Sequence, residues 1–214
     1  EFNIKSSFIY NPLNKTESIN KSKIKTKNYF KKNVKLKIIC VGRFVDQKDQ
    51  ITLLKALKLI KSSVEFETLL LGEGKMLDKY KLFIKKNSLR KKVKLIKFQK
   101  NPYPIIKQSN IVVLSSKYEG LPNILLEGLL LKKYIISSNC PTGPKEILDN
   151  GSGGDLFKVG NYDELAIKFQ NFEKKNIKII NKKIEHGYKR LNRFDYKSNM
   201  EAYLKIVNNE LKKL

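Results

Sequence analysis

The chain has 214 residues with 45 basic and 20 acidic side chains, a formal net charge of +25. Its length suits one hydrophobic core, and no run of about 18 uncharged apolar residues is present to span a bilayer. The opening residues 1–5 lack the pattern of a secretion signal. Cys40 and Cys140 are the only cysteines, which favours packed thiols in a reducing cytoplasm over a disulfide or metal site.

The positive charge comes almost entirely from lysine. Only four arginines are present, at positions 43, 90, 190 and 193. Nucleic-acid recognition motifs interleave arginine with aromatic residues, so this composition makes nucleic acid an unlikely partner. A basic face could instead rest on anionic lipid, which leaves open a peripheral location at the inner face of a bacterial membrane. A lysine-rich genome would produce the same bias.

Residues 1–34 show little periodicity and are predicted to be a linker leading into a domain. One short strand is expected there, at residues 8–12, because an apolar pair precedes Asn11 and Pro12, which favour a turn. The block of lysines between Lys15 and Lys37 is typical of a solvated segment.

Strands and helices alternate regularly from Lys35 onward. Each apolar run of strand length is followed by apolar residues at helical spacing. Because parallel neighbours need crossovers, this predicts an α/β, Rossmann-like, doubly wound parallel sheet over residues 35–176. Extra helices follow over residues 177–214, with Asp195 as a cap. The strands are expected at residues 36–42, 66–71, 93–98, 111–116, 134–137 and 154–159.

Glu119 and Glu127 bracket a predicted helix start directly after the strand at residues 111–116. Proline is favoured at the first helical position, so Pro122 is expected to open this helix. In open parallel sheets ligands bind at the carboxyl ends of strands, and a helix N-terminus attracts phosphate. Ionised carboxylates only accept hydrogen bonds, so they suit sugar hydroxyls. The alternative is an acidic turn followed by a helix-surface glutamate.

Arg43 follows the first regular strand through Gly42, and Lys48 lies five residues later. A guanidinium and an ammonium at this edge could neutralise a diphosphate. A surface arginine at a turn is the alternative. Gly72 ends the second strand, where a missing side chain lets backbone approach a ligand, although such glycine turns are common.

Two loops after later strands extend the predicted edge. The loop from Phe98 through Asn101 could flank a base, or be an ordinary loop, and residues 140–146 form a second loop rich in proline and glycine. His186 is the only histidine and falls in a lysine-rich helical region far along the chain. A Ser-His-Asp or Cys-His nucleophile system would therefore lack its base. No metal-binding cluster or Asp-x-Asp pair is evident, and no cofactor or metal is expected.

Taken in order, these motifs resemble the nucleotide-sugar half of a group 1 (family 4) retaining glycosyltransferase of the GT-B fold. The resemblance covers about residues 35–159 and rests mainly on the glutamate pair with Gly-Leu-Pro inside it. It implies that Arg43 and Lys48 hold the diphosphate, that Glu119 contacts the donor sugar and that Glu127 binds the ribose. It further implies donor contacts from Gly42, from the amides of Gly120, Leu121 and Asn123, and, around the base, from Gly72, Phe98 and Asn101.

The resemblance also implies a partner for this segment. Enzymes of this kind have an amino-terminal acceptor-binding domain, so the resemblance leads us to expect that this chain is a fragment without that domain, toward which the final helix would pack. We therefore expect transfer of a hexose or N-acetylhexosamine from a UDP-sugar to a glycan or lipid-linked acceptor, with the segment alone inactive. The alternatives are a piece that only binds nucleotide sugars and, less favoured, a lysine-rich nucleic-acid binder whose affinity would fall steeply with salt.

Overall fold

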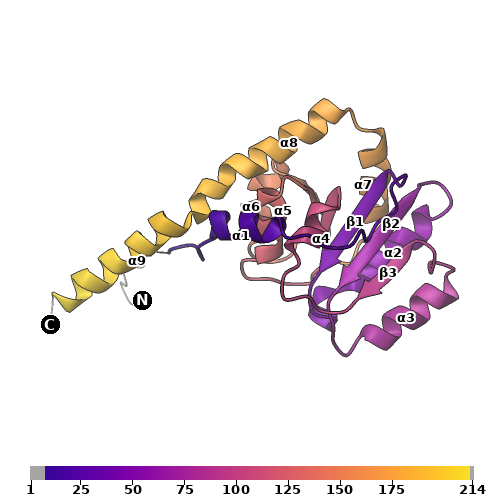
Figure 1. Cartoon of the computed structure of the whole chain (residues 1–214), viewed down its shortest axis with the longest axis horizontal. Helices are drawn as coiled ribbons and strands as arrows, with labels where there is room; N and C mark the ends of the chain where they lie inside the picture. The colour runs from indigo at the N-terminus through magenta and orange to yellow at the C-terminus, as the bar shows by residue number, and fades with distance from the viewer. Residues whose placement is uncertain (1–7, 213–214) are drawn as a thin grey trace.

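The computed structural model describes residues 8–212, so residues 1–7 of the predicted linker and 213–214 of the predicted final helices lie outside the described residues. Within that range, six parallel strands form one sheet in the order β3-β2-β1-β4-β5-β6. The predicted α/β parallel sheet is confirmed (Figure 1). The strands are β1 (Leu36–Val41), β2 (Phe66–Leu71), β3 (Val93–Ile96), β4 (Ile111–Leu114), β5 (Tyr134–Ser138) and β6 (Asp155–Phe157).

The strand order reverses beside β1, whose neighbours are β2 on one side and β4 on the other. The helices that follow β1 and β4 therefore pack on opposite faces of the sheet, and in such sheets ligands bind at the carboxyl edge beside this reversal. This is where the sequence predicts the functional residues.

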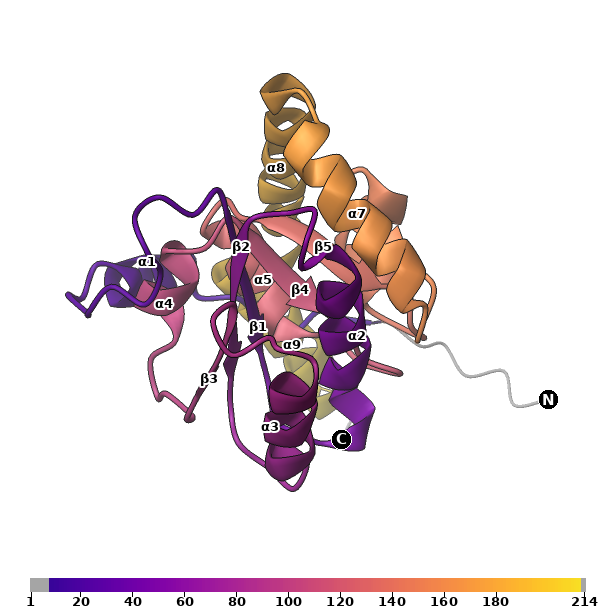
Figure 2. The same cartoon turned by 90° about the vertical axis from the view of Figure 1, so that its right-hand side faces the viewer.

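Helices cover both faces of the sheet, because successive strand residues point to opposite sides. Ile38 and Cys40 of β1 belong to one buried cluster, whereas Ile39 belongs to the other. Figure 2 shows α2 and α7 on one side of the sheet and α1 and α4 on the other. The helices are α1 (Lys15–Ser22), α2 (Gln50–Ile60), α3 (Leu77–Lys86), α4 (Tyr103–Lys107), α5 (Asn123–Leu130), α6 (Pro144–Ile147), α7 (Tyr162–Lys174), α8 (Ile177–Arg190) and α9 (Tyr196–Leu211), with short 3-10 turns η1 (Asp46–Lys48), η2 (Asp149–Gly151) and η3 (Leu191–Phe194).

The amino-terminal segment differs from its prediction. Residues 8–12 form no strand, and the adjacent Leu13 makes only an isolated bridge with Asp195. Pro12 cannot donate to a ladder, and the segment is fixed by side chains instead: the ring of Tyr10 packs on Phe194 with centroids 4.6 Å apart. The sequence also failed to predict α1, whose buried residues are the serines Ser18 and Ser22, so no apolar periodicity marks it.

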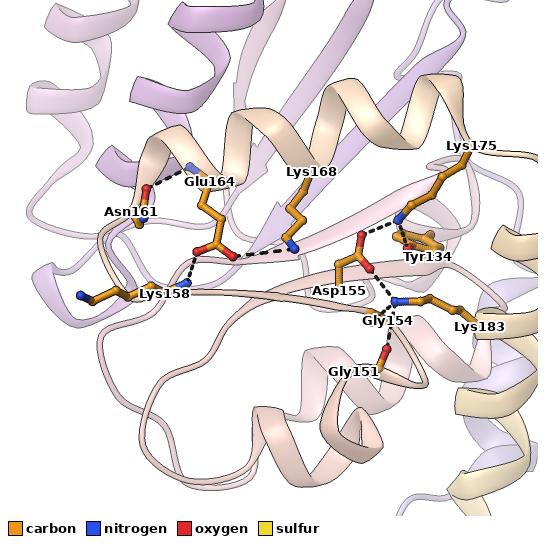
Figure 3. A network of polar contacts seen from close by, with 10 residues as sticks. All are labelled: Tyr134, Gly151, Gly154, Asp155, Lys158, Asn161, Glu164, Lys168, Lys175 and Lys183. Carbon is orange, nitrogen blue, oxygen red and sulfur yellow. Dashed lines mark hydrogen bonds and ion pairs between the residues drawn. The ribbon is translucent and has the colours of Figure 1, made fainter.

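A buried carboxylate fastens α7 and α8 to the last strand (Figure 3). Asp155 of β6 accepts hydrogen bonds from Lys175, just after α7, and from Lys183 of α8, both at 2.6 Å. Burial acts to raise the pKa of Asp155, but the two lysines outweigh it and the pKa lies below its usual value. The helix α8 therefore packs closely on the sheet domain rather than forming a separate unit.

The last helix behaves differently from α8. Asp195 accepts a hydrogen bond from the backbone of Ser198 and caps α9, as predicted. Within the described residues, α9 has no buried side chain, and Figure 1 shows it extending away from the sheet. None of the helices between residues 8 and 212 is long and apolar enough to cross a membrane.

Candidate functional site

The loops after β1 and β4 lie against each other at the carboxyl edge of the sheet. The backbone N–H of Lys117 donates to the carbonyl of Gln47 at 2.8 Å, and the Gln47 side chain donates to the carbonyl of Tyr118 at 3.0 Å. Segments 43–48 and 115–119 thus form one wall, although about 70 residues separate them in sequence.

Lys48 and Glu119 form an ion pair in this wall. The Nζ of Lys48 lies 2.6 Å from Oε1 of Glu119, and the two side chains are 19% and 7% exposed. In a pair that is largely shielded from water the charges attract strongly, but removing both charges from water has a desolvation cost. The two residues are therefore together, as predicted, and each neutralises the other.

Two consecutive serines support the pair. Ser116 donates through its Oγ to the same Oε1 of Glu119 at 2.5 Å, and Ser115 donates to the backbone carbonyl of Lys48 at 3.0 Å. Both serines are fully buried. Buried hydroxyls without partners are costly, so these bonds restrict where the carboxylate and the lysine backbone can lie.

A cavity of about 470 Å³ opens beside this pair, on the side of β2 and β3. It contains five of the predicted residues, which come from four different loops or helices. Arg43 at one wall is exposed, and within residues 8–212 its guanidinium has no hydrogen-bond or ion-pair partner. The lining residues are Val41, Gly42, Arg43, Leu71, Gly72, Glu73, Phe98, Gln99, Lys100, Pro102 and Glu127.

Glu127 lines the cavity from the second turn of α5. Burial raises the pKa of its carboxyl, and a hydrogen bond from the hydroxyl of Tyr103 at 3.2 Å acts in the opposite direction. A partly dry carboxylate facing a cavity is a good acceptor for ligand hydroxyls, because water competes poorly there.

Gly72 lets the first two loops approach closely. A Cβ at this position would lie 2.0 Å from the carbonyl oxygen of Gly42, so no larger residue fits. At Gly42, a Cβ would meet only the aliphatic part of Lys48, at ordinary contact distance. Lys48 therefore lies over Gly42, which connects the ion pair to the cavity.

Gly120 and Leu121 line a second, smaller hollow instead of this cavity. Its other walls come from residues 9–11 and from the loop between β5 and α6. Gly143 makes that contact possible: its φ is +76°, and a Cβ there would lie 2.1 Å from the carbonyl oxygen of Gly120. The predicted loop at residues 140–146 thus does reach the same edge.

Four predicted residues line neither hollow: Lys48 and Glu119, which form the ion pair described above, and Asn123 and Asn101. Asn123 is exposed at the start of α5. The side chain of Asn101 donates to the carbonyl of Lys21 at 3.0 Å, so it ties α1 to the loop after β3. The prediction that Pro122 opens α5 is wrong by one residue, because Pro122 is extended with ψ of 100° and the helix begins at Asn123.

Several residues that shape the site have no predicted role. Gln50 is 1% exposed and donates to the carbonyl of Arg43 at 3.0 Å, while Tyr80 donates to its Oε1. Tyr103, Ser116 and Lys100 lie in segments that were predicted to reach the site, but no role was predicted for their side chains. A polar residue at a predicted buried position, such as Gln50 opening an apolar helix, is the signal that could have identified one of them.

The cavity is lined by the cations Arg43 and Lys100 and the carboxylates Glu73 and Glu127, and the Lys48–Glu119 pair lies next to it through the contact of Lys48 with Gly42. Cations suit a diphosphate, and carboxylates suit hydroxyls. No group of three or more His, Cys, Asp or Glu residues in the described part of the chain is placed to hold a metal ion.

Comparison with known proteins identifies the family. Residues 21–190 match the family described as glycosyl transferases group 1. An uncharacterised glycosyltransferase of Methanocaldococcus jannaschii is 40% identical over 51% of this chain. The capsular polysaccharide biosynthesis glycosyltransferase CapH of Staphylococcus aureus is 28% identical over 89% of it. A Campylobacter jejuni enzyme, the N-acetylgalactosamine-N,N'-diacetylbacillosaminyl-diphospho-undecaprenol 4-alpha-N-acetylgalactosaminyltransferase, is 28% identical over 60%.

Solved structures show the same fold. A glycosyltransferase from Rickettsia africae superposes with a TM-score of 0.85 at 21% identity, covering 96% of this chain and 57% of that one. The Anabaena protein HepE in complex with UDP-glucose gives 0.75 at 19% identity, with coverages of 83% and 49%. The chain spans 27%, 50% and 34% of the lengths of the three relatives named above. By its family match and its fold, this chain belongs to the group 1 glycosyltransferases.

Proposed function

We propose that this chain binds the donor of a glycosyl transfer, a nucleoside diphosphate sugar, in the cavity between Arg43 and Glu127. The observation that carries the proposal is that these two residues, 84 positions apart, line one cavity next to the Lys48–Glu119 pair. The structure of the similar protein HepE was solved in complex with UDP-glucose, which supports UDP as the nucleotide.

The residues divide into four roles in this proposal: contacts with the diphosphate, the sugar, the ribose and the base. Arg43 and Lys48 hold the diphosphate, Glu119 accepts hydrogen bonds from the sugar and Glu127 from the ribose. Gly72 and Phe98 border the base, while the backbone near Gly120, Leu121 and Asn123 faces the sugar or phosphates. Asn101 is not included, because its side chain is bonded to α1.

Transfer would then follow from charge stabilisation. The diphosphate gains negative charge as the bond to the sugar breaks, and cations placed at that point lower the barrier. Lys48 would be shared between Glu119 and the phosphates. We propose front-face attack with retention of configuration and no covalent enzyme intermediate, so that neither glutamate acts as a nucleophile and no metal is required.

The acceptor is proposed to be a glycan or a lipid-linked glycan, with residues outside this chain contributing to its binding. Relatives named for capsular polysaccharide and for a diphospho-undecaprenol acceptor support this class. Contact with an anionic membrane surface is part of the proposal, and flotation with anionic liposomes tests it: binding that is absent, or indifferent to salt, contradicts it. The competing proposal is that this piece binds the donor but does not transfer it.

A thermal-shift panel of UDP, GDP, ADP and their sugars tests the donor assignment. A ligand that binds only the folded form raises the unfolding temperature. We expect UDP and a UDP-sugar to raise it more than the other nucleotides at equal concentration. No shift with any nucleotide would contradict the donor site, and a sugar-transfer assay with this chain separates transfer from binding alone.

A further inference from the structure

A short hydrogen-bond chain connects α1 to the cavity. Ser18 in α1 donates to the hydroxyl of Tyr103 at 3.1 Å, and that hydroxyl donates to Oε1 of Glu127 at 3.2 Å. Ser18 is 5% exposed and Tyr103 half-buried. Tyr103 does not line the cavity, whereas Glu127 does.

The directions of these bonds are fixed by the chemistry of the groups. A tyrosine hydroxyl has one proton, and the carboxylate of Glu127 can only accept. The hydroxyl of Tyr103 therefore donates a hydrogen bond to Glu127 and accepts one from Ser18. Oε1 of Glu127 is then held by a residue outside the cavity, and the remaining lone pairs of the carboxylate can accept hydrogen bonds from groups in the cavity.

The surrounding structure holds Tyr103 in place. It opens α4 between Pro102 and Pro104, its backbone N–H donates to the side chain of Asn101 at 3.3 Å, and Asn101 in turn donates to the last turn of α1. The helices α1 and α4 lie side by side in both views (Figures 1 and 2). The tyrosine thus has little freedom to follow a carboxylate that moves.

Burial and the hydrogen bond have opposite effects on Glu127. Burial raises its pKa, and the bond from Tyr103 lowers it. Charged groups near the carboxylate include Arg43, Glu73 and Lys100, which line the same cavity. Loss of the Tyr103 hydroxyl would leave the half-buried carboxylate of Glu127 both less fixed in position and less readily ionised.

We propose that Tyr103 is a positioning residue for nucleotide binding, which orients the Glu127 carboxylate toward vicinal hydroxyls of the ligand and is itself held by Ser18 of α1. This inference rests on the proposed function, because it takes the cavity to bind a ribose-containing diphosphate. It follows that α1, which lies before the first strand, contributes to the affinity for the nucleotide through Ser18.

Calorimetric titration of UDP and of 2′,3′-dideoxyuridine diphosphate, which lacks the ribose hydroxyls, tests the inference. Tyr103→Phe should weaken UDP binding about tenfold, as expected for a lost hydrogen bond to a charged group, and leave the dideoxy affinity unchanged. In a Glu127→Gln background the same substitution should add little further loss. Tyr203→Phe, on the exposed surface of α9, is the matched control and should bind like the wild type.

The outcomes distinguish the positioning role of Tyr103 from the proposed binding of the nucleotide in the cavity. Failure of the wild type to bind UDP, or equal affinity for both diphosphates, overturns the assignment of Glu127 to the ribose and this inference with it. We expect the wild type to bind UDP more tightly than the dideoxy analogue. If Tyr103→Phe keeps the same preference, or loses affinity for both ligands equally, only the positioning role is wrong. Should Tyr103→Phe fail to fold, Ser18→Ala provides the same test: a smaller loss confined to UDP supports the inference, and no loss contradicts it.

Discussion

At the scale of single residues, the two predicted cations differ in their surroundings. Lys48 is held by Glu119 at 2.6 Å, whereas Arg43 is exposed and, among the described residues, unpaired. A free guanidinium can bind two phosphate oxygens without breaking an existing contact. Arg43 is therefore the cation best placed for the first contact with a diphosphate.

Arg43→Ala should weaken UDP binding about tenfold or more, because hydrogen bonds to charged groups contribute about 1.5–3 kcal/mol. Isothermal titration calorimetry measures this loss directly. Arg90→Ala removes an exposed arginine away from the cavity and is the matched control. Equal UDP affinity in the Arg43 variant and the wild type would refute the phosphate assignment.

Ser116→Ala should affect the sugar end of the site and the fold together. It removes the hydroxyl that donates to the buried Glu119, which predicts a stability loss of about 1–3 kcal/mol in urea unfolding. It should also weaken binding of a UDP-sugar more than that of UDP, because Glu119 is proposed to contact the sugar. Ser62→Ala, at an exposed position, is the control. An equal loss for both ligands would show that Ser116 does not act through the sugar.

At the scale of elements, how well the sequence predicted each one depended on its apolar pattern. The buried runs at β2 and β4 gave nearly correct strands, because every residue in them is buried. The helix α1 carries no such pattern, since lysine and serine dominate it. Its place is set by Tyr103 and Asn101, residues about 80 positions away, and contacts of that range leave no local signal.

The attachment of α7 and α8 to β6 provides a prediction for an element. Asp155→Asn removes one charge from a buried cluster with Lys175 and Lys183, and breaking such a cluster costs about 3–5 kcal/mol. Urea unfolding should show this loss, while Asp78→Asn, whose side chain is 91% exposed, should be nearly neutral. Unchanged stability in the Asp155 variant would mean that the cluster does not fix these helices.

The same carboxyl predicts a pH dependence. Because the pKa of Asp155 is lowered in the folded state, its contribution is fully present above the ordinary value of about 3.9. It is lost as the pH falls through the lowered value. The difference in stability between wild type and Asp155→Asn should therefore shrink below about pH 4.

At the scale of the whole molecule, the site follows from the topology. The parallel sheet brings the carboxyl ends of β1, β2 and β4 to one edge, so Gly42, Gly72 and Glu119 could be predicted to meet there. What the sequence could not predict is the close approach of the loop after β5 to Gly120. That approach depends on Gly143, where a Cβ would lie 2.1 Å from the carbonyl oxygen of Gly120.

The central claim is that the nucleotide binds in the cavity between Arg43 and Glu127. A crystal structure of this chain with UDP tests it most directly. We expect the diphosphate within hydrogen-bond distance of Arg43, the ribose hydroxyls at the carboxylate of Glu127 and the base between Gly72 and Phe98. UDP found elsewhere on the surface, with the cavity between Arg43 and Glu127 unfilled, would contradict the account.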